Sequence, residues 1–271
     1  FDDFSEAQCI VDDGEVLIKS ACVEVGQGFV TLVGQIVEET LGISDITILP
    51  VDTSIGSAGS TSASRQTWMS GGAVLKACEA VVDALLLDLS SENGVAYDKS
   101  GLNLVSKDGS HSIDISAALR GRNYDEHVTH RHKRTFPLDH NGQGNAHVSF
   151  AFAAHRAVVD VDEELGLVRV VEIATSQDVG RVLNPVQARG QIEGGIAQGL
   201  GLALLEDLVL DNGKIVNANF TDYLLPTSMD TPPIKIASLI EQSEPGAPFG
   251  AKGIGEPPVI SSTPAIISAV R

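Results

Sequence analysis

Cysteine is scarce in this chain and unevenly spaced. Only Cys9, Cys22 and Cys78 occur in 271 residues, and no two of them form a Cys-x-x-Cys pair. An iron–sulfur cluster or a structural zinc site needs more thiolates at closer spacing, so neither is expected within this chain. An odd number of scattered cysteines also argues against a disulfide framework and favours buried thiols in a reducing, cytoplasmic compartment.

Positive charge is also scarce. The chain has 18 Lys and Arg against 36 Asp and Glu, a net charge of −18. Such a surface repels phosphates, so nucleic acids and anionic membranes are not expected as partners. No apolar run approaches the ~20 residues that span a bilayer, so no membrane anchor is expected. The remaining composition is that of a globular protein with a large core, in one large domain or two smaller ones.

Several common catalytic signatures are missing. There is no Gly-Lys-Ser/Thr phosphate loop, and the serines lack a nucleophile-elbow motif. The glycine pairs at 142–144 and 199–201 lack the spacing and the downstream acid of a dinucleotide fingerprint. His127, His130 and His132 invite a metal site, but basic neighbours oppose a dication and no further ligand follows at suitable spacing. A solvated or interface loop is therefore expected there, with no direct metal ligand.

Hydrophobic periodicity predicts strands and helices in irregular alternation. The predicted strands are 15–24, 46–51, 146–154, 157–173 and 234–240, the helices are 29–41, 68–89, 192–205 and 259–270, and a hairpin covers 209–216. Gly42 is expected to end the first helix. This order predicts an α+β (mixed α/β) fold. The polar, turn-rich stretch 92–145 suggests an internal boundary, with subdomains 1–125 and 126–271.

A lone carboxylate ends the glycine-rich loop Pro-Phe-Gly-Ala-Lys-Gly-Ile-Gly-Glu at 248–256. Pro257 suits the first turn of a helix, so Glu256 is expected beside a helix N-terminus, whose partial positive charge favours the ionised carboxylate. An ionised carboxylate held by a loop is what a general base requires. The alternative is a glutamate that only caps the helix.

Three further glycine-bearing loops offer backbone N–H groups with amide or hydroxyl side chains. They are Gly26-Gln27-Gly28, residues 56–66 and residues 191–195. Backbone amides at helix N-termini suit anions such as a pyrophosphate, and glutamines suit the edge of a polar heterocycle. Together with Glu256, these loops predict a chain that wraps an anionic organic cofactor. Each loop alone could equally be a tight turn, a helix cap or a packing contact.

Five motifs follow one another in a defined order: Val-Gly-Gln-Gly at 25–28, Thr-Ser-Ala-Ser at 61–64, Asp-Val-Gly-Arg-Val-Leu-Asn-Pro at 178–185, Gln-Ile-Glu-Gly at 191–194 and Gly-Ile-Gly-Glu-Pro-Pro at 253–258. This series resembles the molybdenum hydroxylases, the family of xanthine dehydrogenase and aldehyde oxidoreductase. The resemblance covers nearly the whole chain. It is to the C-terminal half of the molybdenum-binding large subunit, and most of all to that of bacterial xanthine dehydrogenases.

The resemblance implies a molybdopterin-binding domain and a role for each motif. Glu256 corresponds to the active-site base. The residues that resemble cofactor contacts are Gly26, Gln27, Gly28, Ala63, Ser64, Arg65, Gln191, Lys252, Gly253 and Gly255. Gln27 is implied to reach the molybdenum ligands, and Gln191 the pterin. Val25 stands where the family usually has methionine.

The implied cofactor is molybdenum–molybdopterin, in the cytosine dinucleotide form if the protein is bacterial, with the metal held through the pterin. The implied reaction hydroxylates an electron-poor carbon of a purine such as hypoxanthine or xanthine with oxygen from water. An aldehyde, nicotinate-type or carbon monoxide oxidising enzyme is the alternative within the family, and a cofactor-free structural or assembly subunit is the alternative outside it. The chain begins without Met and is expected to be a piece that is inactive alone. Its expected partners are the N-terminal half of the subunit and the domains or subunits that carry 2Fe-2S clusters and FAD.

Overall fold

The computed structural model describes residues 3–271 and divides into two compact units. The first comprises the chain up to Ser149 together with Pro245–Ala251, and the second comprises Phe150–Glu244 together with Lys252–Arg271. Each unit contains both helices and sheet, which confirms the α+β prediction. The division differs from the predicted one, because the position 125/126 falls inside a strand of the first unit, β7 (Asn123–Arg131).

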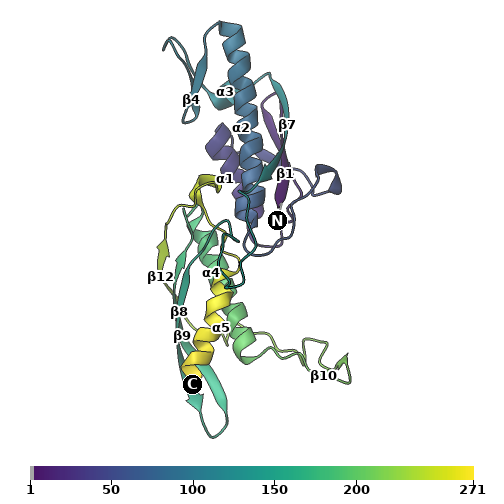
Figure 1. The fold of residues 1–271 in the computed structure, drawn as a ribbon, viewed down its shortest axis with the longest axis vertical. Helices are drawn as coiled ribbons and strands as arrows, with labels where there is room; N and C mark the ends of the chain where they lie inside the picture. Colours follow the sequence, from purple (N-terminus) through teal and green to yellow (C-terminus); the bar gives the residue numbers. More distant parts are fainter. Residues whose placement is uncertain (1–2) are drawn as a thin grey trace. The chain divides into compact units, whose positions relative to one another are not determined.

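The first unit is built on a four-stranded sheet (Figure 1). Its strands are β1 (Phe4–Asp12), β2 (Glu15–Ser20), β3 (Ile46–Ile48) and β7, in the order β3-β2-β1-β7. β1 lies antiparallel to both β2 and β7, and alternate residues of β1 are buried, as expected for a sheet with one covered face. The sequence-based prediction overlooked β1.

Two helices, α1 (Phe29–Leu41) and α2 (Gln66–Asn93), form the core of this unit together with the sheet. α1 has the predicted bounds. Its predicted cap is confirmed, since Gly42 is left-handed and its N–H donates to the Glu38 carbonyl at 2.9 Å. α2 contacts β1 and β7, and the sheet approaches it closely at Gly72, where an added Cβ would lie 2.6 Å from His130 Nε2.

About half of the predicted turn-rich stretch 92–145 forms regular elements, and the rest is turns and irregular chain. It contains β4 (Tyr97–Ser100), β5 (Asn103–Ser106), β6 (Ser112–Asp114) and α3 (Ile115–Leu119), as well as β7. These elements are too short to give a strong periodic signal, and the turns between them dominate the composition. Two short 3₁₀ helices complete the unit, η1 (Thr53–Ile55) and η2 (Pro248–Gly250).

The second unit holds a three-stranded sheet in the order β12-β9-β8. Its strands are β8 (Ala153–Asp162), β9 (Leu167–Asp178) and β12 (Ile234–Ile240). The predicted break near His155 is wrong, since His155 lies inside β8. The chain reverses at 163–166 instead, where the Asp162 carboxylate accepts the N–H groups of Glu164 and Leu165 and Gly166 is left-handed.

Two helices complete this unit, α4 (Pro185–Leu204) and α5 (Pro257–Val270). α4 begins seven residues before the predicted start, because the Asn184 side chain caps it and Pro185 fills its first turn. The predicted hairpin is confirmed as β10 (Leu210–Asp211) and β11 (Lys214–Ile215). No helix within residues 3–271 is long and apolar enough to cross a bilayer.

Candidate functional site

The predicted site residues fall into two groups, one in each unit. The first unit contains Gly26-Gln27-Gly28 and Ala63-Ser64-Arg65, whereas the second contains Gln191 and the loop 252–256. Each group is coherent within its own unit.

The Gly26–Gly28 loop, between β2 and α1, is shaped by a carboxylate that sequence reasoning missed. Gly26 and Gly28 have φ values of 97° and 86°, which favour glycine. Glu24 Oε1 accepts their N–H groups at 2.7 and 3.1 Å, and Oε2 accepts that of Val30 at 3.0 Å. Partial burial raises the pKa of Glu24, but these backbone N–H donors outweigh it and hold the pKa below its usual value. Within its unit, the loop therefore pairs its N–H groups with Glu24.

The Gln27 amide is also used within this loop. Its Oε1 accepts the Val25 N–H at 2.6 Å, and its Nε2 donates to the Val23 carbonyl at 2.9 Å. One N–H of the amide and the second lone pair of its oxygen remain for another partner. Gln27 thus acts first on the shape of its loop.

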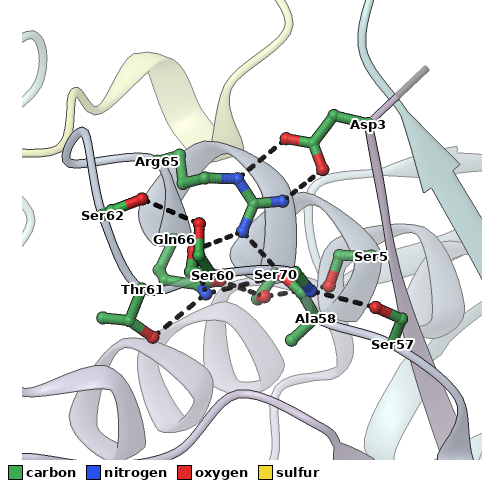
Figure 2. A network of polar contacts seen from close by, with 11 residues as sticks. Asp3, Ser5, Ser57, Ala58, Ser60, Thr61, Ser62, Arg65, Gln66 and Ser70 are labelled. Atoms are coloured by element: carbon green, nitrogen blue, oxygen red, sulfur yellow. Dashed lines mark hydrogen bonds and ion pairs between the residues drawn. The ribbon is translucent and has the colours of Figure 1, made fainter. Parts of the chain in front are cut away.

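Arg65 organises the second loop, residues 56–65, as Figure 2 shows. Its Nε and Nη2 donate to the two Asp3 carboxylate oxygens, both at 2.8 Å, and its Nη1 donates to the carbonyls of Ala58 and Ser60 at 2.6 and 2.7 Å. Four of the five guanidinium N–H groups are therefore used, and the side chain is only 14% exposed. Arg65 fastens the loop to the residue before β1.

The same loop carries backbone strain just before α2. Ala63 and Ser64 have φ values of 52° and 53°, a left-handed conformation that is costly for residues with a Cβ. Gln66 and Ser70 support the loop from the first turns of α2. Gln66 Nε2 donates to the Ser60 carbonyl at 3.1 Å, and Ser70 Oγ bonds to Gln66 Oε1 (Figure 2). Strain held in place by surrounding bonds is typical of loops that clamp a ligand.

In the second unit, Glu256 is the residue that precedes α5, as predicted. Its side chain makes no capping hydrogen bond to that helix. Pro257 and Pro258 have no N–H to offer, and the next two N–H groups, of Val259 and Ile260, bond to the Glu256 carbonyl at 3.0 and 3.2 Å. Glu256 thus occupies the N-cap position of α5 without a capping bond from its side chain. The half-buried carboxylate lies at the N-terminus of a 14-residue helix, beside the positive end of the helix dipole.

Glycines bring α4 and α5 into close contact. An added Cβ on Gly195 would lie 2.7 Å from Pro258 Cβ, and one on Gly199 would lie 2.1 Å from Ser262 Oγ. The two helices therefore run parallel. Gln191 is one turn before Gly195 and so lies at the level of the loop that carries Glu256. The half-buried Gln191 amide makes no side-chain hydrogen bond with residues 3–271. The pair Gly199 and Gly201 belongs to this helix interior and forms no nucleotide loop.

Lys252 is the first residue of the loop 252–256, here called the base loop, and its side chain forms a buried ion pair. Its Nζ donates to Asp178 Oδ2 at 2.6 Å and to the Phe150 carbonyl at 2.8 Å. The Lys252 and Asp178 side chains are 7% and 3% exposed. Beyond Lys252, Gly253 and Gly255 flank Ile254, which packs against the core of the second unit.

The predicted histidine loop is instead strand β7, which turns His127 and His130 to opposite faces. His130 stacks against Trp68, with ring centroids 5.2 Å apart, and its Nε2 is buried without a hydrogen-bond partner among residues 3–271. Across residues 3–271, no group of three or more His, Cys, Asp or Glu side chains could hold a metal ion. The polar groups of the predicted site residues are instead the side-chain amides of Gln27 and Gln191 and the hydroxyl-rich loop 56–65, groups that can bond to a polar organic molecule.

Comparison with known proteins agrees with this donor set. A family profile described as the molybdopterin cofactor-binding domain matches residues 3–232. The chain is 33% identical over 269 residues to the gamma subunit of the 6-hydroxypseudooxynicotine dehydrogenase complex of Paenarthrobacter nicotinovorans, covering 95% of this chain and 33% of that protein. It is 31% identical over 280 residues to the xanthine dehydrogenase molybdenum-binding subunit of Escherichia coli O157:H7, covering 96% of this chain and 35% of that subunit.

Among solved structures, the chain is similar to quinoline 2-oxidoreductase from Pseudomonas putida 86, with a TM-score of 0.81 and 26% identity over 98% of this chain and 35% of that one. It spans about a third of the length of the curated relatives it matches. A match over residues 3–232 together with this shared fold establishes the family. The chain belongs to the molybdenum hydroxylases, as part of their molybdopterin cofactor-binding domain.

Proposed function

We propose that this chain is the cofactor-holding and base-supplying part of an enzyme that hydroxylates an electron-poor carbon of a purine such as hypoxanthine or xanthine, with oxygen from water. One observation carries the proposal: Glu256 stands at a helix N-terminus with a carboxylate that the helix does not use as a cap. Gln191 lies at the same level on the neighbouring helix. A base and an amide at one level suit a polar heterocyclic ligand.

The donor set of the chain fits molybdenum–molybdopterin in the family's manner, with the metal held through the pterin. Gln191 would bind the pterin edge, and the strained Ala63-Ser64 turn at the start of α2 would bind an anionic group, of a cytosine dinucleotide in a bacterial enzyme. Gly26, Gln27 and Gly28 would approach the pterin through the remaining N–H of the Gln27 amide. When bound, this cofactor supplies the water-derived oxygen and accepts two electrons from the substrate.

Glu256 acts as the general base in this reaction. The attacking oxygen must lose a proton as it approaches carbon, and a carboxylate held beside it accepts that proton. The positive end of the α5 dipole lies beside this carboxylate. The other residues bind and orient, and Lys252, Gly253 and Gly255 belong to the loop that presents Glu256.

Other substrate classes occur among the relatives. Those reported above include proteins named for a nicotine derivative and for quinoline. An aldehyde, a nicotinate-type heterocycle or carbon monoxide is the alternative substrate within the family. A cofactor-free structural or assembly subunit is the alternative of another class. We place the protein in the cytoplasm, where its buried free thiols Cys9, Cys22 and Cys78 would stay reduced.

The chain is also proposed to need partners. Residues 205–233 expose large apolar side chains, among them Phe220 at 82% and Met229 at 91%. Exposed apolar groups in one segment mark a contact surface. The proposed partner is the N-terminal half of the same large subunit, and the enzyme would be inactive without it. The 2Fe-2S clusters and FAD would lie on further domains or subunits and take the electrons away.

The test is Glu256→Gln in the complex purified through this chain, with turnover measured on hypoxanthine, xanthine and nicotinate. We expect kcat to fall by at least about 10³-fold while molybdenum content is unchanged, because the base acts only in the chemical step. The matched control is Glu163→Gln, which removes an exposed carboxylate from the β8–β9 turn and should change neither value. Near-normal kcat in Glu256→Gln with full molybdenum would contradict the assignment.

A further inference from the structure

The buried ion pair between Lys252 and Asp178 joins three separate segments of the second unit. Asp178 is the last residue of β9 and Lys252 opens the base loop. Lys252 Nζ reaches the Phe150 carbonyl at 2.8 Å, and the Asp178 N–H donates to the Phe152 carbonyl at 2.8 Å. The pair therefore ties the start of the unit, the end of β9 and the base loop together.

Backbone bonds reinforce the same junction. The Lys252 N–H donates to the Val179 carbonyl at 3.0 Å, and Asp178 Oδ1 accepts the Gly180 N–H at 3.1 Å. Both carboxylate oxygens of Asp178 are thus used, one by the ammonium and one by the backbone. The charge pair is satisfied in a site where a lone charge would be costly.

The ion pair is close enough along the chain to influence the position of the proposed base, Glu256. Glu256 is only four residues beyond Lys252, so its Cα lies within about 14 Å of the anchored residue. Ile254 holds the middle of the loop in the core, and the contact between Gly195 and Pro258 fixes the start of α5. The loop is thus held on both sides of Glu256, and on the N-terminal side the ion pair acts together with the Lys252 N–H bond and the packing of Ile254.

Stability alone does not explain a buried ion pair. Two apolar side chains of similar volume often stabilise a protein as well or better, because burying charges costs solvation. A charged and hydrogen-bonded pair does fix the position of the loop relative to β9, since the ammonium and the carboxylate bond in few geometries.

We propose that Asp178 is a positioning residue for the base: acting through Lys252, it sets where the Glu256 carboxylate stands. This inference rests on the proposed function and gives Lys252 a role within the protein, in place of direct contact with the cofactor.

The test is the double variant Asp178→Leu/Lys252→Met in the purified complex. It replaces both charges with apolar groups, so that no lone buried charge unfolds the unit. We expect kcat per bound molybdenum to fall about 10²-fold, as for an active-site group misplaced by about 1 Å. KM should change little. Asp178→Glu keeps the negative charge but shifts its position, so its kcat per bound molybdenum should fall less than that of the double variant.

A second readout does not depend on turnover. Backbone amide hydrogen exchange in residues 252–256 should become at least about 10-fold faster in the double variant, because the loop has lost one anchor. The control is Asp160→Asn, which breaks the exposed pair with Arg169 in the β8–β9 hairpin, with side chains 63% and 77% exposed. It should change neither exchange in this loop nor kcat.

Three outcomes separate the two proposals. Unchanged kcat per molybdenum and unchanged exchange in the double variant, while Glu256→Gln is inactive, would overturn the positioning role alone. A fall in activity that only follows loss of molybdenum, with kcat per molybdenum constant, would also overturn it. Full activity in Glu256→Gln would instead overturn the proposed function.

Discussion

Gly195 and Pro258 touch across the interface between α4 and α5, where a Cβ on Gly195 would lie 2.7 Å from Pro258 Cβ. Pro258 is the second residue of α5, and the proposed base precedes that helix. The small size of Gly195 therefore determines how closely the proposed base approaches α4, the helix that also carries Gln191.

Replacing Gly195 with alanine should destabilise the second unit. The methyl group would overlap Pro258, and overpacking of this kind costs about 1–3 kcal/mol. Gly194→Ala is the matched control, since its Cβ would meet nothing within 4 Å and the change should add about 0.5–1 kcal/mol of helix stability. Urea unfolding of both variants would measure the difference. Equal stabilities would show that the helices are not in contact at Gly195.

Arg65→Lys should loosen the loop at 56–65. Lysine cannot reproduce the two parallel bonds to Asp3 together with the two to the Ala58 and Ser60 carbonyls. We expect a loss of about 2 kcal/mol, typical of charged hydrogen bonds at a shielded site. Arg169→Lys, at an arginine that is 77% exposed, should change the free energy of unfolding by less than about 0.5 kcal/mol. An unchanged free energy of unfolding in Arg65→Lys would mean that the loop keeps its conformation without the guanidinium bonds of Arg65.

Glu24→Gln should destabilise α1 in a pH-dependent manner. The backbone N–H groups hold the folded pKa of Glu24 below its unfolded value despite the opposing effect of burial. Its contribution is therefore complete above the unfolded pKa of about 4.3 and is lost as pH falls through the folded pKa. We expect a cost of about 1 kcal/mol at pH 7. The gap between wild type and variant should close as pH falls below about 4, and a constant gap would exclude the ionic cap.

Acid should weaken the second unit through His155. Burial lowers its pKa in the folded protein, where its Nδ1 lies 2.6 Å from Ser261 Oγ on α5. A depressed pKa means that stability is complete above the unfolded value of about 6.5 and falls as pH drops toward the folded pKa, by at most about 1.4 kcal/mol per pH unit. Thermal melting between pH 7.5 and 5 should show a smaller pH slope in His155→Asn. The pKa of His130 is also lowered, first by burial and then by the charges of Lys76 and His132. Its titration adds a second pH dependence, which belongs to the stability of the first unit. An identical slope in His155→Asn would contradict this.

Elements with strong local signals could be predicted from the sequence. α1 and the Gly42 cap match their predicted positions, as does β12, because periodicity and capping are local properties. The β8–β9 turn was predicted in the wrong place although Asp162 and Gly166 are typical turn residues, because the polar pair His155-Arg156 interrupts the apolar pattern inside β8. Likewise, β7 appears polar in sequence because only one of its faces is covered.

The candidate site was only half visible in sequence. Glu256 could be located because glycines and prolines mark its loop. Glu24 and Asp178 could not, since each acts through a hydrogen bond or ion pair that depends on tertiary structure. The Ser-x-Ser-rich stretch around Thr61 appeared as a ligand loop, whereas its attachment to β1 through Arg65 and Asp3 became visible only in the fold.

The central claim is that this chain holds a molybdenum cofactor, and the most direct test is the molybdenum content of the complex purified through it from its native host. Plasma mass spectrometry should find close to one molybdenum per copy of the chain, together with a pterin released on denaturation. No molybdenum in a complex that retains its partners, after growth with ample molybdate, would contradict the account and favour a structural subunit.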